Sequence, residues 1–329
     1  MEAHRNGVYS CCPSWLPNRL SSLEEIETAW ETEEYKKIKN SIINGTYEFC
    51  SETQCPYLME LLTVGKKHTC FIEKSQFNED NYKYPTNINI AFDRSCNLSC
   101  PSCRTDKIMS NENDIVFIDN MIEQISDKFG KHLTLLYLSG SADPFASKSI
   151  RKFLLNFDKQ KFEKLKRIHL HTNGLLLTEK IWNDLSHIHD IIKTLEISID
   201  SSTKEVYEII RRDGNWETLL KNLEFISKIK MGNKRVSFVV QDSNYFQMED
   251  FYNLMMKIFN NKVDVFFNKI QNWGTYSNAE FKLKQIWSEE HPEFEKFLEH
   301  LKKIHLKFRC IHNMHEIVDK HIVTKKLLF

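Results

Sequence analysis

The sequence predicts an α/β protein built around a partial, TIM-like (β/α)6 barrel. Two observations lead to this prediction. From about residue 84, apolar runs rich in β-branched and aromatic residues alternate with segments of helical periodicity. Polar residues directly follow each apolar run, as expected where parallel strands end at one rim of a barrel. A small Cys-rich N-terminal module and a helical C-terminal tail are expected to flank this core.

The expected strands have the largely apolar composition of buried parallel strands, and helical patterns fill the gaps between them. The strands are expected at 86–92, 133–138, 167–171, 194–199, 235–240 and 263–267. The helices are expected at 114–129, 148–157, 178–187, 203–210, 216–230 and 247–259. Because crossovers between parallel strands are right-handed, the C-terminal ends of these strands should meet at one rim, with the helices outside.

Three parts are expected along the chain: an N-terminal module over 1–83, the barrel core over 84–275 and a helical extension over 276–329. In the extension, an apolar stripe at helical spacing is interpreted as core packing; it comprises Phe294, Phe297, Leu298 and Leu301.

The N-terminal module is expected to hold one helix, over about 23–43. Ser22 and Glu25 fit a capping box, and Gly45 is a natural helix stop. The apolar runs of this part are too few for a sizeable core, so its fold is expected to depend on a metal.

Composition narrows the function classes. Lys+Arg and Asp+Glu are equal at 45 each, so no broad charged field argues for a nucleic-acid partner. The N-terminus lacks the apolar core of a signal peptide, and no run approaches the roughly 20 apolar residues of a membrane span. The protein is therefore expected to be soluble and cytoplasmic, and its 9 cysteines point to metal or catalysis rather than disulfides.

Three closely spaced cysteines, Cys96, Cys100 and Cys103, follow the first expected strand. Three thiolates can hold three irons of a four-iron cluster and leave the fourth iron without a protein ligand. A structural zinc site usually has four ligands in two Cys-x2-Cys pairs, and it stays the alternative together with free thiols.

The spacing Cys-x3-Cys-x2-Cys resembles that of the radical S-adenosylmethionine (radical SAM) enzymes. The resemblance implies that Cys96, Cys100 and Cys103 hold a [4Fe–4S] cluster whose open iron binds S-adenosylmethionine (SAM). It also implies that an electron from the cluster cleaves SAM to a 5′-deoxyadenosyl radical, which takes hydrogen from a substrate. Ser102 departs from the family pattern, in which an aromatic residue often precedes the third cysteine.

The segment 138–144 resembles the Gly-Gly-Glu-Pro loop of this family, which receives the ammonium group of SAM. The resemblance assigns Ser139, Gly140 and Asp143 to that role, with Asp143 standing where Glu is usual. An ordinary Asp-Pro turn is the alternative.

The pattern after the fourth expected strand is similar to that of the SPASM-type subgroup of radical SAM enzymes. By this resemblance Ser198 touches the ribose and Arg211 reaches the methionyl carboxylate of SAM, with Arg212 as the less favoured substitute for Arg211. Asn173 lies on the same rim and is a weaker cofactor candidate, since Asn-Gly is also a common turn. A packed histidine is at least as plausible as a binding role for His171.

The N-terminal part looks like a piece of a SPASM or twitch domain, which in other members follows the barrel and carries auxiliary [4Fe–4S] clusters. The resemblance implies one auxiliary cluster, with Cys11 as the alternative to Cys12; its ligands would be Cys12, Cys50, Cys55 and Cys70. A zinc site with the same ligands and free thiols stay open. Cys310 is expected to be a buried thiol.

The expected function is that of a radical SAM enzyme of the oxidoreductase or maturase type. Modification of a peptide or protein side chain is the first expectation, and oxidation or epimerisation of a sugar or polyol is the alternative. A non-catalytic iron–sulfur or zinc protein is the rival from another class. The family implies an electron donor such as flavodoxin or ferredoxin, and the expected substrate partner is a peptide, a protein or a carbohydrate. Neither nucleic acid nor a membrane is an expected partner.

Overall fold

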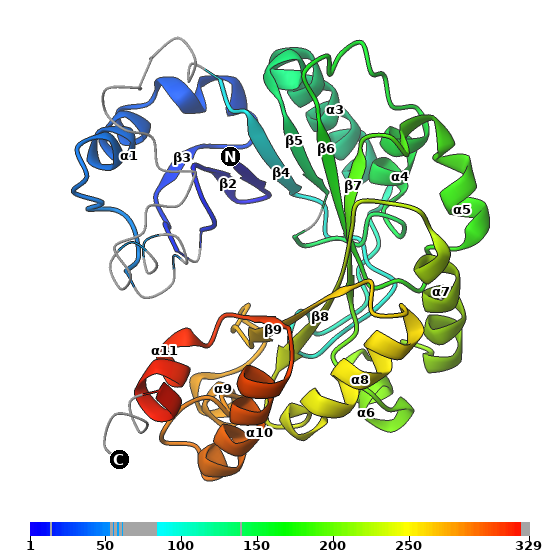
Figure 1. Cartoon of the computed structure of the whole chain (residues 1–329). Coiled ribbons are helices and arrows are strands. Elements are labelled where there is room, and N and C mark those ends of the chain that lie inside the picture. Colours follow the sequence, from blue (N-terminus) through cyan, green and yellow to red (C-terminus); the bar gives the residue numbers. More distant parts are fainter. Residues whose placement is uncertain are drawn as a thin grey trace. The chain divides into compact units, whose positions relative to one another are not determined.

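The structure is a computed structural model that describes residues 1–13, 15–52, 55, 58, 61, 84–138 and 140–323. The chain divides into two compact units (Figure 1). Unit 1 comprises Met1–Arg94, Ser110–Ala142 and Ser147–His169, and unit 2 comprises Ser95–Met109, Asp143–Ala146 and Leu170–Phe329. The three-part domain division expected from the sequence stays a prediction.

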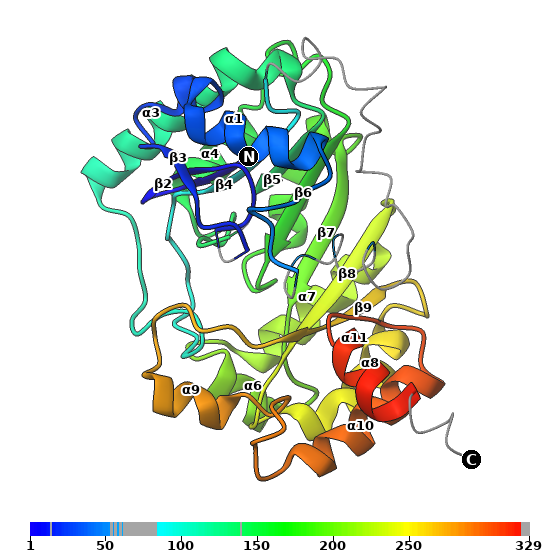
Figure 2. The same cartoon turned by 90° about the vertical axis from the view of Figure 1, so that its left-hand side faces the viewer.

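Unit 1 contains the strands that begin the sheet (Figure 2). They are β1 (Glu2–His4), β2 (Gly7–Tyr9), β3 (Arg19–Ser21), β4 (Asn87–Ala91) and β5 (Leu135–Leu138), hydrogen-bonded in the order β3-β2-β1-β4-β5. β1 and β5 both run parallel to β4, whereas β1–β2 and β2–β3 are antiparallel pairs. The sequence analysis did not predict β1–β3, because strands of three residues are too short to show alternation.

Among the described residues, unit 1 includes the helices α1 (Glu33–Ile43), α3 (Glu112–Phe129) and α4 (Lys148–Leu155), with short 3-10 turns at Ile26–Glu31 and Gly130–His132. The prediction of one helix over 23–43 was wrong in its first part. Ser22 and Glu25 do bond to each other, since Ser22 Oγ accepts from Glu25 N at 3.2 Å. This contact precedes the 3-10 turn, however, and α1 begins only after Thr32, whose Oγ1 accepts from Tyr35 N at 3.2 Å.

Unit 2 contains the rest of the sheet, in the order β6-β7-β8-β9-β10. β6 (Arg167–Thr172) crosses the division between the units, and β7 (Ile192–Ser198), β8 (Asn233–Val240), β9 (Asp264–Lys269) and β10 (Ile311–His312) follow. The pairs β7–β8, β8–β9 and β9–β10 are parallel. The two-residue strand β10 was not predicted.

The helices of unit 2 alternate with these strands and then form the tail. They are α5 (Glu179–Asp184), α6 (Lys204–Ile210), α7 (Trp216–Lys228), α8 (Met248–Ile258), α9 (Asn278–Lys284), α10 (Phe294–Lys307) and α11 (His315–Val318). Short 3-10 turns lie at Ser186–Ile188 and Tyr245–Gln247, and a π-helical turn at Asp319–Val323 ends the described chain. The predicted stripe of α10 is buried, and Phe297 packs with its ring centroid 6.4 Å from that of Tyr245.

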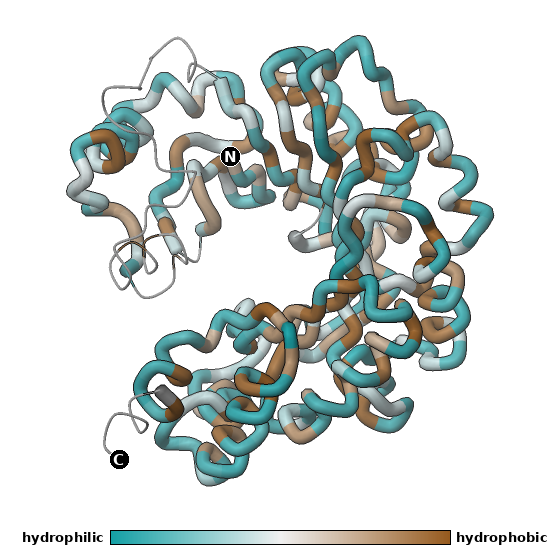
Figure 3. Tube along the Cα trace, viewed as in Figure 1, coloured by the Kyte–Doolittle hydropathy of each residue, from teal (hydrophilic) through white to brown (hydrophobic). Residues whose placement is uncertain are grey.

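The predicted α/β class is confirmed, because each of the six expected strands is present as β4–β9 and is followed by a helix. Hydrophobic and hydrophilic residues alternate along the helices (Figure 3), and α3, α7, α8 and α10 each bury several apolar residues, whereas α9 buries none. Among the described residues, no helix combines the length and the apolar content that a bilayer crossing would need.

Candidate functional site

The three predicted cysteines lie together in the segment Ser95–Met109 of unit 2, directly after β4. Cys96 N donates to Ile108 O at 2.9 Å, which closes the two ends of the segment onto each other. Cys103 N and Arg104 N both donate to Cys100 O, at 2.9 and 3.0 Å. These backbone bonds fix a tight turn, so the three thiols are held by the loop itself rather than by packing alone.

Each of the three sulfurs receives a hydrogen bond. Leu98 N lies 3.4 Å from Cys96 Sγ, and Arg104 Nη2 lies 3.4 Å from Cys103 Sγ. Arg211 Nη1 lies 3.8 Å from Cys100 Sγ. Hydrogen bonds and cationic donors stabilise negative charge on sulfur, so this arrangement favours metal-bound thiolates.

Burial opposes ionisation of the same thiols when no metal is bound. It raises the pKa of Cys96 to about 11, and Asp143 adds to the rise. Burial also raises the pKa of Cys100, while the guanidinium of Arg211 acts to lower it. Since thiolate ligands must lose their protons, a metal that binds here replaces those protons.

Arg211 and Asp200 form a buried ion pair behind Cys100. Arg211 Nη2 lies 2.7 Å from Asp200 Oδ2, and Val239 N donates to Asp200 Oδ1 at 2.8 Å. Burial acts to lower the pKa of Arg211, but Asp200 and Cys100 outweigh it and raise that pKa. Arg211 Nε is buried and has no hydrogen-bond partner among the described residues. The guanidinium is therefore a fixed positive charge whose buried Nε–H is still unused.

Asp143 is buried, and its carboxylate accepts hydrogen bonds from four protein donors. Oδ1 accepts from Phe145 N at 2.9 Å and Ala146 N at 3.2 Å. Oδ2 accepts from Thr172 Oγ1 at 2.7 Å and Asn173 N at 2.8 Å. The side chain thus ties its own turn to the end of β6, and its predicted role with an ammonium group stays a prediction.

Asn173 comes closer to the cysteines than its weak sequence signal indicated. Its Nδ2 lies 3.7 Å from Cys96 Sγ and donates to Asn97 Oδ1 at 2.9 Å. Its Oδ1 accepts from Leu175 N at 3.0 Å, which fixes the orientation of the amide. Asn173 therefore orients the loop that carries Cys96.

Among the described residues, the two remaining candidates, Gly140 and Ser198, do not hydrogen-bond to the cysteine loop. Gly140 belongs to unit 1 and has φ of 100°, and a Cβ there would lie 2.6 Å from the Ala91 Cβ, so this turn requires glycine. Ser198 Oγ lies 2.6 Å from His171 Nε2 and 3.2 Å from Ser237 Oγ. Ser139 lies outside the described residues.

The comparison with protein families shows which family the chain belongs to. Residues 90–255, half of the chain, match the model of the radical SAM superfamily. The chain belongs to the radical SAM superfamily. Radical SAM enzymes use a [4Fe–4S] cluster and SAM, so the predicted family, its enzyme class and these two cofactors are confirmed.

Individual relatives resemble the chain only in part. The GTP 3′,8-cyclase of Clostridium botulinum (strain Okra / Type B1) is 25% identical over 173 residues, which are 52% of this chain and 52% of that protein. A probable GTP 3′,8-cyclase of Methanococcus maripaludis (strain C6 / ATCC BAA-1332) is 23% identical over 181 residues, 55% of this chain and 58% of that protein. The match thus spans about half the length of these curated relatives. Streptococcus suis SuiB bound to S-adenosylmethionine is 13% identical with a TM-score of 0.48, covering 87% of this chain and 62% of SuiB.

The radical SAM cluster fits the chemistry of the three-cysteine loop. The segment Ser95–Met109 contains three cysteines and no histidine, so it offers three ligands of the right type and not four. No group of three or more His, Cys, Asp or Glu side chains in the described part of the chain surrounds a single metal position. In a four-iron cluster each cysteine binds a different iron. The orphaned Arg211 Nε offers a donor to an anionic group beside it.

The sequence analysis missed the residues that clamp this loop from the end of α6. Ser99 N donates to Arg212 O at 3.1 Å, and Ser99 Oγ donates to Asp213 Oδ2 at 2.5 Å. Arg212 Nε donates to Ser99 Oγ at 2.9 Å, and its Nη2 donates to Thr105 O. Arg104 was missed as well, although its position next to Cys103 in the sequence was a usable signal.

Four of the predicted N-terminal ligands or alternatives lie in unit 1, namely Cys11, Cys12, Cys50 and Cys55, whereas Cys70 lies outside the described residues. Burial raises the pKa of Cys11 to about 11, and the nearby Cys12 and Cys55 thiols add to the rise. Burial also raises the pKa of Cys50, again with a contribution from Cys55. These thiols are therefore electrostatic neighbours.

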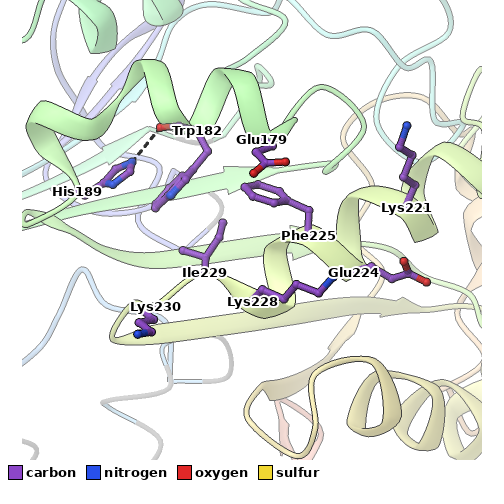
Figure 4. Close-up of a pocket in the computed structure, with 9 residues that line it drawn as sticks. All are labelled: Glu179, Trp182, His189, Lys221, Glu224, Phe225, Lys228, Ile229 and Lys230. Carbon is purple, nitrogen blue, oxygen red and sulfur yellow. Dashed lines mark hydrogen bonds between the residues drawn. The ribbon is translucent and has the colours of Figure 1, made fainter.

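A separate cavity of about 510 Å³ lies on unit 2 between α5 and α7 (Figure 4). Trp182 and Phe225 form its apolar part, and His189 stacks on Trp182 with ring centroids 4.2 Å apart. None of the predicted site residues lines this cavity.

Proposed function

We propose that this radical SAM enzyme binds its cluster through Cys96, Cys100 and Cys103 and leaves one iron open for SAM. The observation that carries the proposal is the three-cysteine loop in which each thiol receives a protein hydrogen bond. When bound and reduced, the cluster supplies the electron that cleaves SAM to methionine and a 5′-deoxyadenosyl radical, which abstracts hydrogen from the substrate.

In this proposal Arg211 stabilises the negative charge on Cys100 Sγ and also binds SAM. Its Nη2 is held by Asp200 and its Nη1 lies next to Cys100 Sγ, so the side chain cannot turn away. The buried Nε then donates to the methionyl carboxylate of SAM, which relieves its unsatisfied state. Asn173 and Arg104 stabilise the charge of the sulfurs, at Cys96 and Cys103 respectively.

The remaining SAM contacts follow the family resemblance. Ser139 and Gly140 belong to the loop after β5 that receives the ammonium group, and Asp143 shapes this loop through its four hydrogen bonds. Ser198 is proposed to contact the ribose, and its hydroxyl is already oriented by His171.

The substrate class proposed first is a peptide or protein side chain, with a flavodoxin- or ferredoxin-type protein as electron donor. Oxidation or epimerisation of a sugar or polyol is the second candidate. The hydroxyl and imidazole groups of Ser198, Ser237 and His171 favour it, because such groups bind substrate hydroxyls well.

An auxiliary [4Fe–4S] cluster is proposed for Cys12, Cys50, Cys55 and Cys70, with Cys11 as the alternative to Cys12. Support comes from the position of Cys11, Cys12, Cys50 and Cys55 in unit 1, where Cys12 and Cys55 help to raise the pKa of Cys11. A variant with Ala at Cys96, Cys100 and Cys103 should still hold about four irons per chain after anaerobic reconstitution. Iron-free protein that holds one zinc would refute the auxiliary cluster and leave the radical SAM site untouched.

The experiment for the main proposal measures SAM cleavage. The anaerobically reconstituted and reduced enzyme should form 5′-deoxyadenosine from SAM, and Cys100→Ala should form none. Cys310→Ala is the matched control, since Cys310 lies near the start of β10 and contacts Ile304 O rather than the cluster loop. Full cleavage by Cys100→Ala would overturn the assignment.

A further inference from the structure

In unit 2, one face of β7 and β8 is largely apolar, and the opposite face carries several polar side chains beside Val239. On β8 the alternate residues Val236, Phe238 and Val240 are fully buried, and Phe238 packs against Phe251 of α8. The opposite face of β7 and β8 carries two in-register pairs, which are Glu196 with Arg235 and Ser198 with Ser237. A polar, partly exposed sheet face beside a catalytic site is a surface that a substrate can reach.

This face adjoins the proposed SAM site. His171 acts electrostatically on Asp200, the partner of Arg211, and bonds to Ser198 Oγ at 2.6 Å. Glu196 precedes Ser198 by two residues on β7, which is about 7 Å along a strand. A substrate next to the cofactor therefore lies within reach of Glu196 and Arg235.

The guanidinium of Arg235 contacts Glu196 and Phe266, whereas the edge formed by its Nε and Nη2 atoms has no partner among the described residues. Glu196 Oε2 lies 3.6 Å from Nη1, which is too long for a direct hydrogen bond but fixes the side of the guanidinium that faces the carboxylate. Phe266 lies under the guanidinium, with 5.2 Å between Arg235 Cζ and the ring centroid. Arg235 Nε is buried and has no hydrogen-bond partner among the described residues.

An unsatisfied, buried N–H of this kind is costly unless a ligand completes it. Nε and Nη2 form the edge that matches the two oxygens of a carboxylate or a phosphate. We propose that Arg235 binds an oxyanion group of the substrate through this edge, and that Glu196 and Phe266 hold the guanidinium in place. The inference rests on the proposed function, because it assumes that the substrate lies on this face of β6–β8.

The test is binding of inorganic phosphate and of acetate to the reconstituted holoenzyme, without reductant. Phosphate is followed by broadening of its 31P NMR line, and acetate by saturation transfer from protein to its methyl protons. We expect saturable binding of at least one probe, about tenfold weaker in Arg235→Gln. Arg235→Lys keeps the positive charge but loses the paired N–H donors of the guanidinium, so it should also weaken binding of the anion.

Glu196→Gln makes the test specific. The Gln side chain keeps an oxygen beside Arg235 Nη1, so the guanidinium stays held while the negative charge that repels the anion is lost. Anion binding should therefore become tighter, opposite to the effect of Arg235→Gln. If the Glu196–Arg235 pair had only a structural role, both substitutions would change the anion affinity in the same direction. Arg167→Gln, at the exposed start of β6, is the control and should bind like the wild type.

Each outcome bears on the inference. Binding of phosphate alone supports a phosphorylated substrate, and binding of acetate alone supports a carboxylate. No binding of either probe, or equal binding by Arg235→Gln, overturns the subsite. Because the assay uses neither SAM cleavage nor electrons, it stays valid even if Cys100→Ala refutes the proposed function.

Discussion

The guanidinium of Arg211 bridges a carboxylate and a thiol: its Nη2 lies 2.7 Å from Asp200 Oδ2, and its Nη1 lies 3.8 Å from Cys100 Sγ. Asp200 has φ of 66°, a left-handed conformation that Asp and Asn tolerate better than most residues. The Asp200–Arg211 pair therefore stabilises this turn and also places a positive charge next to Cys100.

Removal of Arg211 alone should destabilise the protein strongly. Arg211→Met leaves the Asp200 carboxylate buried without its cation, which costs about 3–5 kcal/mol in comparable pairs. Adding Asp200→Asn to Arg211→Met removes the unpaired buried charge, and Asn tolerates the φ of 66° at this position. The double variant should therefore regain part of the lost free energy of unfolding. Urea unfolding of the single and double variants measures this, and a double variant no more stable than Arg211→Met would contradict it.

The Ser99 clamp should control how firmly the loop holds its cluster. Ser99→Ala removes the bonds of Ser99 Oγ to Asp213 and Arg212, so iron should be lost faster to a chelator. Iron release is followed by the decay of the cluster absorbance in oxygen-free buffer. Ser227→Ala is a matched control, because its hydroxyl bonds only within α7, to Glu224 O. Equal rates in both variants would argue against the clamp.

Lys234 should stabilise the end of α7. Its Nζ lies 2.7 Å from Ser227 O and 2.9 Å from Ile229 O, so it binds carbonyls that the helix leaves unpaired. Lys234→Met should cost about 1–3 kcal/mol of unfolding free energy. Lys230→Met, at an exposed position nearby, should change it by less than about 0.5 kcal/mol. Thermal unfolding compares the two, and equal melting temperatures would refute this role.

His312 should make the fold sensitive to acid. Burial, together with the nearby His315 and His305, lowers the pKa of His312 to about 4. Its Nδ1 accepts from Met314 N at 3.3 Å, a bond that protonation would destroy. Because the folded pKa lies below the ordinary 6.5, this stability is complete above about pH 6.5 and is lost as the pH falls toward 4.

The loss expected from His312 between pH 7 and pH 5 is on the order of 2 kcal/mol. His312→Asn should flatten the pH dependence of the unfolding free energy in this window, whereas His187→Asn, at an exposed position, should not. Parallel pH profiles for the wild type and His312→Asn would contradict the prediction.

The fold was predicted from local sequence patterns, and contacts between residues far apart in the sequence could not be predicted. The strands β4–β9 could be predicted because each is an apolar run bounded by polar residues, but β1 joins β4 through a pairing of Ala3 with Ile90 that no local pattern shows. The three cysteines were found by their spacing. The pairing of Asp200 with Arg211 could not be predicted from the sequence, since it depends on a turn in which Asp200 has a positive φ. The four bonds of Asp143 likewise come from β6 and its own turn, which only the folded chain brings together.

The central claim is an iron at the three-cysteine loop that has no protein ligand and binds SAM. The direct measurement is electron–nuclear double resonance on the reduced cluster, with SAM labelled by 15N at its amino group and by 17O at its carboxylate. The protein used is a variant that can hold only the cluster of the three-cysteine loop. In it, Ala replaces the N-terminal cysteines Cys11, Cys12, Cys50, Cys55 and Cys70. The account predicts hyperfine coupling from both labels. A cluster spectrum that SAM leaves unchanged, with no coupling to either label, would contradict it.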